Sequence, residues 1–205
     1  MTHMKKVKIC GITNLKDAVA AERSGADIIG FIFAASPRKI KPAKAGRIIR
    51  ALKLSTMKAG VFVDEDAGKV NVLIKQLKLN IVQLSGAESP AYIKKIKGAK
   101  VIKTIKVRGK KSALKEARKY GRHVYALLFD TYHGRIQGGT GRTFDWKAVG
   151  GVKSPFFIAG GLKPENIREA IKQAKPFGVD VNSGVESRPG KKDLKKLKAL
   201  FKALS

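Results

Sequence analysis

The sequence predicts an α/β fold in which a single domain closes into a (β/α)8 barrel, the TIM barrel. Eight short runs rich in β-branched and aromatic residues alternate with segments of helical apolar spacing, which favours parallel strands joined by crossover helices. Divided over eight units, the 205 residues give about 26 residues per unit, the length of a compact βα module. No linker or low-complexity stretch divides the chain. We therefore expect one domain over residues 1–205, with residues 1–4 set aside as an N-terminal extension or an expression remnant.

The expected strands follow one another at regular intervals. In chain order they are Val7–Cys10, Ile28–Phe33, Ala59–Val63, Ile81–Leu84, Val101–Ile105, Tyr125–Phe129, Phe156–Ala159 and Val179–Val181. Between them apolar residues recur at spacings of three and four, as a helix with one buried face requires. An open, doubly wound sheet stays an alternative at this point, because periodicity does not show whether the eighth strand pairs with the first.

Capping residues support the expected helix boundaries. Asn14 and Ser89 each stand before the first residue of an expected helix, and Pro164 is placed in the first turn of the helix after the seventh strand. The longest polar, glycine-rich interruption is His133–Thr143, directly after the sixth strand. A loop of that length is expected to be functional or mobile.

Composition excludes several classes of protein. The chain has 44 Lys and Arg against 15 Asp and Glu, a formal net charge of +29, which predicts a strongly basic surface but not a fold. It has no apolar run of the roughly 18 residues that a membrane helix needs, and no apolar core of a signal peptide, so we expect a cytoplasmic protein without membrane contact. A single cysteine forms no intrachain disulfide, and three scattered histidines make a metal site unexpected.

Candidate catalytic residues stand where the expected strands end. Reactive groups of a parallel barrel collect at the carboxyl ends of its strands, where this sequence has Cys10 after the first strand and Asp130 after the sixth. Lys8 shares a strand face with Cys10, and a nearby cation can lower the pKa of a thiol. A buried lysine needs a partner, which Asp180 on the eighth strand supplies if the barrel closes. Cys10 as an apolar filler and Asp130 as a turn residue are the simpler alternatives.

Two turns on consecutive strands predict a phosphate site. Gly160–Gly161 follows the seventh strand and Ser183–Gly184 the eighth, and backbone N–H groups in such turns can approach a phosphate closely. Tight turns without a ligand are the simpler interpretation. Arg38, after the second strand, has the planar guanidinium that suits a carboxylate, although one solvated charge among 44 basic residues is the simpler interpretation. Gln83 faces inward from the fourth strand and offers a neutral hydrogen-bonding group.

Short motifs in a fixed order cover nearly the whole chain. They are VKICGIT (7–13), GFIF (30–33) with Arg38, GVFV (60–63), VQL (82–84), FDT (129–131), GGTGRTFDW (138–146), AGGLKPEN (159–166), VDVNSGVE (179–186) and GKKD (190–193). Together they resemble the phosphoribosylanthranilate isomerase family of tryptophan biosynthesis. Their joint occurrence is highly specific.

The resemblance implies a barrel that isomerises N-(5-phosphoribosyl)anthranilate by an Amadori rearrangement, without a metal or organic cofactor. It implies that Cys10 is the general base and Asp130 the general acid, the first a thiolate and the second protonated when substrate binds. Arg38 would hold the anthranilate carboxylate and the two glycine turns the phosphate. Asp180 would contact sugar hydroxyls, in competition with its expected ion pair. Ser85 stands where the family commonly has histidine, a difference expected to affect binding.

The expected partner is a small phosphorylated substrate, and the chain is expected to be a monomer or a homodimer. Another phosphate-binding barrel enzyme of aminoaldose metabolism is one alternative. A barrel that binds polyanions is a second, suggested by the charge of +29. The lysines are spread over most expected helices, however, and one Trp and four Tyr give no interleaving of aromatic and basic residues suited to base stacking. Specific nucleic-acid binding is therefore not expected.

Overall fold

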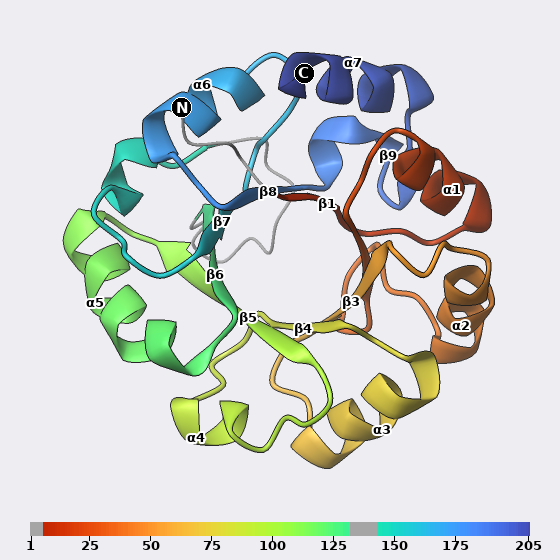
Figure 1. The fold of residues 1–205 in the computed structure, drawn as a ribbon, viewed down its shortest axis with the longest axis horizontal. Coiled ribbons are helices and arrows are strands. Elements are labelled where there is room, and N and C mark those ends of the chain that lie inside the picture. Colours follow the sequence, from red (N-terminus) through yellow and green to blue (C-terminus); the bar gives the residue numbers. More distant parts are fainter. Residues whose placement is uncertain (1–5, 132–142) are drawn as a thin grey trace.

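Eight parallel strands form a closed barrel at the centre of the computed structural model, which describes residues 6–131 and 143–205 (Figure 1). The strands are β1 (Lys6–Ile9), β2 (Ile28–Ile32), β3 (Met57–Phe62), β4 (Ile81–Leu84), β5 (Lys100–Val107), β6 (Ala126–Thr131), β7 (Phe156–Ile158) and β8 (Gly178–Val181). Strand β1 pairs with both β2 and β8. The predicted barrel is confirmed, and the open sheet is excluded because the last barrel strand closes on the first.

Apolar side chains form two layers, because successive residues of a strand point to opposite faces. The layer inside the barrel consists of Ile28, Ala59, Ile81, Ile102, Ala126, Leu128, Phe157 and Ala159. A ring of helices surrounds the strands (Figure 1). A larger cluster of apolar side chains packs between the strands and these helices. Polar residues that share the inward face near the carboxyl ends of the strands therefore meet at one mouth of the barrel.

The helices lie outside the strands. They are α1 (Leu15–Arg23), α2 (Pro42–Arg50), α3 (Ala67–Leu77), α4 (Pro90–Ile93), α5 (Lys110–Tyr120), α6 (Ile167–Ala174) and α7 (Leu194–Leu204), with short 3-10 helices at Gly121–His123, Trp146–Val149 and Ser183–Val185. The two predicted caps are confirmed, since the Asn14 side chain accepts from the Asp17 N–H and the Ser89 side chain from the Tyr92 N–H.

The start of α6 differs from the prediction. The helix begins at Ile167, and Pro164 lies in the turn before it. Asn166 explains the delay: its Nδ2 donates to the Gly161 carbonyl at 2.9 Å, and its Oδ1 accepts from the Lys163 N–H at 2.9 Å. These bonds hold the chain in a loop for several residues after β7.

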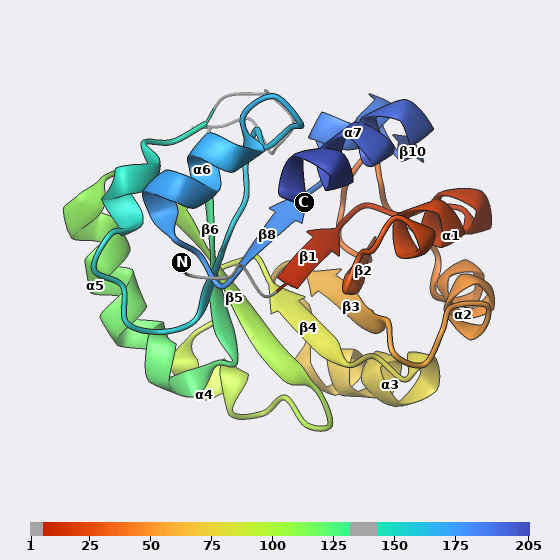
Figure 2. The same cartoon turned by 45° about the horizontal axis from the view of Figure 1, so that its top comes forward.

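A small antiparallel hairpin after β8 was not expected from the sequence. It pairs β9 (Glu186–Arg188) with β10 (Lys191–Lys192), and Figure 2 shows β10 next to α7. Of the glycine-rich segment His133–Thr143, only Thr143 belongs to the described residues, and residues 1–4 lie outside them as well. Within the described ranges, no helix has both the length and the hydropathy that crossing a bilayer requires.

Candidate active site

A cavity of about 150 Å³ opens at the carboxyl ends of the barrel strands. Eight of the nine residues predicted for the site line it, namely Cys10, Arg38, Gln83, Asp130, Gly160, Gly161, Asp180 and Ser183. They come from opposite sides of the barrel and are far apart in sequence, so closure of the barrel is what brings them together. This mouth is where parallel barrels place reacting groups.

Gly184 is the predicted site residue that does not line the cavity. A Cβ on Gly184 would collide with the Leu162 carbonyl oxygen and would lie 3.0 Å from the Lys163 Cα. Its bare backbone thus packs the turn after β8 directly against the loop after β7. Gly184 thus packs the two turns against each other.

The turn after β7 depends on glycine. Gly160 and Gly161 have φ of +82° and +66°, in the left-handed region that residues with a Cβ rarely adopt. A Cβ on Gly160 would also lie 2.7 Å from Asp130 Oδ1. The turn therefore approaches the acidic residue of β6 as closely as its backbone allows.

Lys8 and Asp180 form the ion pair that the sequence predicts. The Nζ of Lys8 donates to Asp180 Oδ2 at 2.7 Å, and the two side chains are 0% and 7% exposed. The residues are direct partners in the β1–β8 register. Burial by itself lowers the pKa of Lys8, but the negative charge of Asp180 and the nearby Cys10 outweigh it and raise that pKa. The other carboxylate oxygen, Oδ1, is buried and has no hydrogen-bond partner.

Cys10 lies at the end of β1, where its N–H donates to the Val181 carbonyl at 3.0 Å. The residue is 4% exposed. Burial raises the pKa of the Cys10 thiol, the charge of Lys8 lowers it, and the charge of Asp180 raises it again. The result differs from the expected lowering by a cation, because desolvation and Asp180 together exceed the effect of Lys8. The protein without substrate favours the neutral thiol.

Asp130 lies on β6 and forms an ion pair with Lys106 of β5. Its Oδ1 also accepts from the Thr131 N–H at 2.9 Å. The side chain of Asp130 is 23% exposed and that of Lys106 is 43% exposed, so this pair faces solvent at the mouth. Nothing in the sequence alone marked Lys106 among the many lysines of this chain.

Gln83 belongs to a small cluster of neutral polar groups. Its Nε2 lies 3.2 Å from Ser85 Oγ and 3.4 Å from Thr104 Oγ1, and the two hydroxyl oxygens are 2.8 Å apart. The amide oxygen, Oε1, is buried without a partner. Ser85 thus takes part in a hydroxyl network on the wall of the barrel.

Arg38 reaches the cavity but is already held by an acidic residue. Its Nε lies 3.0 Å from both Glu186 carboxylate oxygens, and its Nη2 donates to Oε2 at 2.8 Å. The Nζ of Lys192 donates to Glu186 Oε1 at 3.0 Å and to Asn182 Oδ1 at 3.0 Å. Burial alone would raise the pKa of Glu186, but the hydrogen bond from Arg38 and the charge of Lys192 hold it below its usual value.

Sequence reasoning missed this network around Glu186. Glu186 and Lys192 both stood inside the recognised motifs VDVNSGVE and GKKD. The available signal was an acidic residue inside a recognised motif, in a chain that has only 15 acidic residues.

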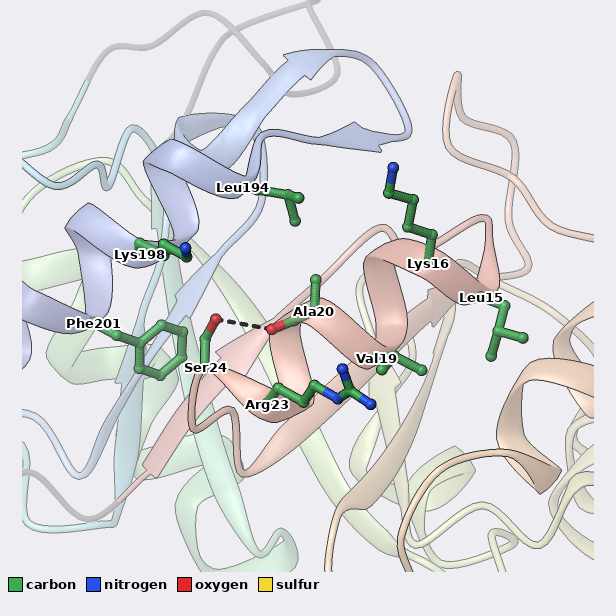
Figure 3. A pocket seen from close by; sticks show the side chains of 9 residues that line it. All are labelled: Leu15, Lys16, Val19, Ala20, Arg23, Ser24, Leu194, Lys198 and Phe201. Carbon is green, nitrogen blue, oxygen red and sulfur yellow. Dashed lines mark hydrogen bonds between the residues drawn. The ribbon is translucent and has the colours of Figure 1, made fainter.

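A larger groove lies outside the barrel, between α1 and α7 (Figure 3). It has a volume of about 970 Å³, and its lining includes Leu15, Val19, Leu194 and Phe201. None of the predicted site residues lies there. No group of three or more His, Cys, Asp or Glu side chains within the described ranges could hold a metal ion. The cavity inside the barrel is therefore the candidate site.

Comparison with known proteins identifies the family. The model of the family described as N-(5'phosphoribosyl)anthranilate (PRA) isomerase matches residues 7–203. The chain belongs to this family. A relative of the same name from Pelobacter propionicus is 44% identical over 202 residues, covering 97% of this chain and 95% of the relative.

Solved structures of the family have the same fold as this chain. The crystal structure of phosphoribosyl anthranilate isomerase from Thermotoga maritima matches with a TM-score of 0.91 at 39% identity, covering 98% of each chain. A structure of the isomerase in complex with reduced 1-(o-carboxyphenylamino)-1-deoxyribulose 5-phosphate matches with a TM-score of 0.87 at 38% identity, again over 98% of each chain. The resemblance drawn from the motifs is confirmed.

Proposed function

We propose that this chain catalyses the Amadori rearrangement of N-(5-phosphoribosyl)anthranilate to 1-(2-carboxyphenylamino)-1-deoxyribulose 5-phosphate in tryptophan biosynthesis. One observation carries the assignment of roles: a thiol and a carboxyl group, Cys10 and Asp130, line the same cavity as the glycine turn after β7. An acid and a base beside a phosphate site are what this rearrangement requires.

The reaction needs two proton transfers. Asp130 donates a proton to the furanose ring oxygen, the bond from that oxygen to C1′ breaks, and the chain opens to an iminium ion. Cys10 then removes the proton from C2′, and the electrons of that bond flow to the iminium nitrogen to give an enolamine, which tautomerises to the ketone. The iminium accepts the electrons itself, so the mechanism needs only a placed acid and a placed base.

Asp130 has to exchange partners before it acts. In the free protein its carboxylate holds the Lys106 ammonium and the Thr131 N–H. Lys106 is a long, partly exposed side chain at the mouth, so it can swing away as the sugar enters. The carboxylate, released from the ammonium, takes up a proton from solvent, and the ring oxygen of the substrate then lies beside the protonated carboxyl group.

The remaining residues bind the substrate. The phosphate lies against the backbone of Gly160 and Gly161 and the turn at Ser183, which Gly184 packs in place. Arg38 directs N–H groups to the anthranilate carboxylate: a guanidinium carries five donors, and Glu186 occupies its Nε and Nη2.

The sugar hydroxyls donate to two of the buried oxygens that lack partners among the described residues. Asp180 Oδ1 and Gln83 Oε1 both lie on residues that line the cavity. Buried acceptors without donors are costly, so a ligand that supplies donors gains from satisfying them.

Variants of the acid and the base test this proposal. The fluorescence of anthranilate follows conversion of freshly made substrate, and Cys10→Ser and Asp130→Asn should each lower kcat by about 10²- to 10⁴-fold. Asp27→Asn is the matched control, because Asp27 pairs with Lys6 at the opposite end of the strands and lines no part of the cavity. Unchanged kcat in either of the first two variants would reject the assigned roles.

Localisation and assembly belong to the same proposal. As a biosynthetic isomerase acting on a phosphorylated metabolite, the chain would work in the cytoplasm. One matched crystal structure shows mutually generated monomers of the dimeric isomerase from Thermotoga maritima. We propose a monomer or homodimer here as well, and light scattering at several concentrations distinguishes the two states.

A further inference from the structure

Lys8 is a fully buried charged side chain on the inward face of β1 to which the reaction above gives no task. Its Nζ lies 2.7 Å from Asp180 Oδ2. Gly30 shows what else is beside it. A Cβ built on Gly30 would lie 2.7 Å from Cys10 Sγ and 3.2 Å from Lys8 Nζ. The sulfur and the ammonium therefore crowd the same small space, which is open because Gly30 has no side chain.

We propose that Lys8 is a positioning residue of the isomerase reaction, with its ammonium shared between the Asp180 carboxylate and the Cys10 sulfur, in a space that Gly30 keeps open. This inference rests on the proposed function, in which Cys10 is the general base. Lys8 touches no substrate atom. It acts through the sulfur, whose negative charge it balances after the proton has left.

The surroundings of Cys10 explain why a cation is required. A thiolate buried in an apolar wall loses its hydration, and an opposite charge within about 4–6 Å offsets that loss. The charged groups that act on the sulfur come from three elements: Lys8 on β1, Asp180 on β8 and Lys192 on β10. Lys192 is tied to Glu186 and Asn182, and the negative charge of Asp130 acts on Asp180 rather than on the sulfur. Lys8 is thus the cation that can turn to the sulfur.

Asp180 links substrate binding to the interaction between the Lys8 ammonium and the Cys10 sulfur. Its Oδ2 holds Lys8, while its Oδ1 is buried, lacks a partner and belongs to a residue that lines the cavity. A sugar hydroxyl that donates to Oδ1 withdraws part of the negative charge from Lys8. The ammonium then interacts more strongly with the sulfur, so substrate binding itself favours the thiolate.

Titration of the single cysteine tests the inference without any need for catalysis. Thiolate formation is followed at 240 nm, and the signal of Cys10→Ser is subtracted to remove tyrosine ionisation. Asp180→Asn should titrate at lower pH than the wild type, because Lys8 loses its competing carboxylate. Asp180→Asn combined with Lys8→Met should titrate about one pH unit or more above Asp180→Asn, a tenfold difference in thiolate. Equal midpoints for these two variants, or the opposite order, would overturn the inference.

The comparison avoids a buried Asp180 carboxylate without a cation. Lys8→Met alone leaves the Asp180 carboxylate buried without a cation, and such a variant can fail to fold. If the double variant fails to fold, Asp180→Asn decides by itself: a midpoint equal to or above that of the wild type overturns the sharing of Lys8. Lys6→Met is the matched control on the same strand, where Lys6 pairs with half-buried Asp27 at 2.8 Å, and its midpoint and kcat should not change.

Kinetics separate this inference from the proposed function. Loss of the cation should lower kcat of the double variant below that of Asp180→Asn, while KM stays the same. Lys8→Arg in place of Lys8→Met in that double variant keeps a cation and should restore part of kcat. If the wild type does not convert the substrate, the proposed function fails, and if Cys10→Ser keeps full isomerase activity, the role of Cys10 as general base fails. In both cases the titration still shows whether Lys8 and Cys10 are coupled.

Discussion

Two buried lysine–carboxylate pairs lie on opposite faces of the same sheet and differ in how completely their carboxylate oxygens are hydrogen-bonded. Lys103 and Glu88, on the outer side near α4, are joined at 2.9 Å and are 3% and 1% exposed. Both oxygens of Glu88 have donors: Oε1 accepts from the N–H groups of Asp64 and Gly86, and Oε2 accepts from Gly86 and Lys103. The inner pair, Lys8 and Asp180, is equally buried but leaves Asp180 Oδ1 without a donor.

The difference distinguishes a structural pair from a functional one. A fully satisfied buried pair fixes geometry, here the loop after β4, and has no capacity left for a ligand. A pair with one unsatisfied oxygen beside a cavity costs stability until a donor arrives. The matched amide variants should therefore differ in what they lose. Asp180→Asn should mainly lose activity, and Glu88→Gln should mainly lose stability.

Of the variants that test this comparison, Asp180→Asn should have the largest effect on catalysis. The amide oxygen can stay on Lys8, which turns the NH2 group toward the cavity and replaces an acceptor by a donor. We expect kcat/KM of the isomerase to fall by about 10²- to 10³-fold, the usual loss for a placed hydrogen bond at a reacting centre. Anthranilate fluorescence measures it, and a change of less than about threefold would remove Asp180 from the site.

Glu88→Gln should affect stability instead. Both oxygens of Glu88 accept hydrogen bonds, so the amide NH2 must face a backbone N–H or Lys103. Breaking a buried ion pair in this way costs about 3–5 kcal/mol of the free energy of unfolding. Urea denaturation measures the loss, and kcat/KM at a temperature where the variant is folded should equal that of the wild type. A larger destabilisation by Asp180→Asn than by Glu88→Gln would contradict the comparison.

Ionisation of Glu186, which holds Arg38, should make the stability of the protein depend on pH. The pKa of Glu186 is lower in the folded protein than in the unfolded chain, where glutamate titrates at about 4.3. Its contribution to stability is therefore present above about pH 4.3 and is lost as the pH falls through the lower folded value. Glu186→Gln should lose stability at pH 7 and show less change between pH 6 and pH 3. Stability is measured by urea denaturation at each pH. If it changes with pH in Glu186→Gln as much as in the wild type, the ion pairs of Glu186 contribute nothing to stability.

The smallest effect is expected at the phosphate turn. Gly161 has a φ of +66°, and an alanine there costs about 1–2 kcal/mol of backbone strain. Gly161→Ala should raise KM about tenfold and change kcat less, because the turn binds substrate without joining the proton transfers. Gly109→Ala is the control, since Gly109 also has a positive φ, of +150°, but a Cβ there would contact nothing within 4 Å. Equal KM values for Gly161→Ala and the wild type would remove the turn from the phosphate site.

The sequence predicts the fold and the inner pair for the same physical reason. Alternation of strands and helices indicates parallel strands, and eight equal units indicate closure. Once β1 and β8 are neighbours, an inward lysine such as Lys8 must find a carboxylate on the next strand, and Asp180 is the one at the same level. The eight cavity residues follow from their places at strand ends.

Other features depend on contacts that no local pattern reveals. The direction of the Cys10 pKa follows from the balance between burial and two opposite charges, and that balance requires coordinates. The bonds of Lys106 and Arg38 to acidic residues depend on which lysine or arginine, among 44 basic residues, reaches them. The late start of α6 follows from the side-chain bonds of Asn166 rather than from proline.

A crystal structure of this protein with reduced 1-(o-carboxyphenylamino)-1-deoxyribulose 5-phosphate, the ligand of one matched structure, tests the central claim most directly. We expect the phosphate on the backbone of Gly160 and Gly161, and a sugar hydroxyl within hydrogen-bond distance of Asp180 Oδ1. Lys8 should stay in contact with Asp180 Oδ2. A ligand bound elsewhere, or one that leaves Asp180 Oδ1 without a donor, would contradict the account.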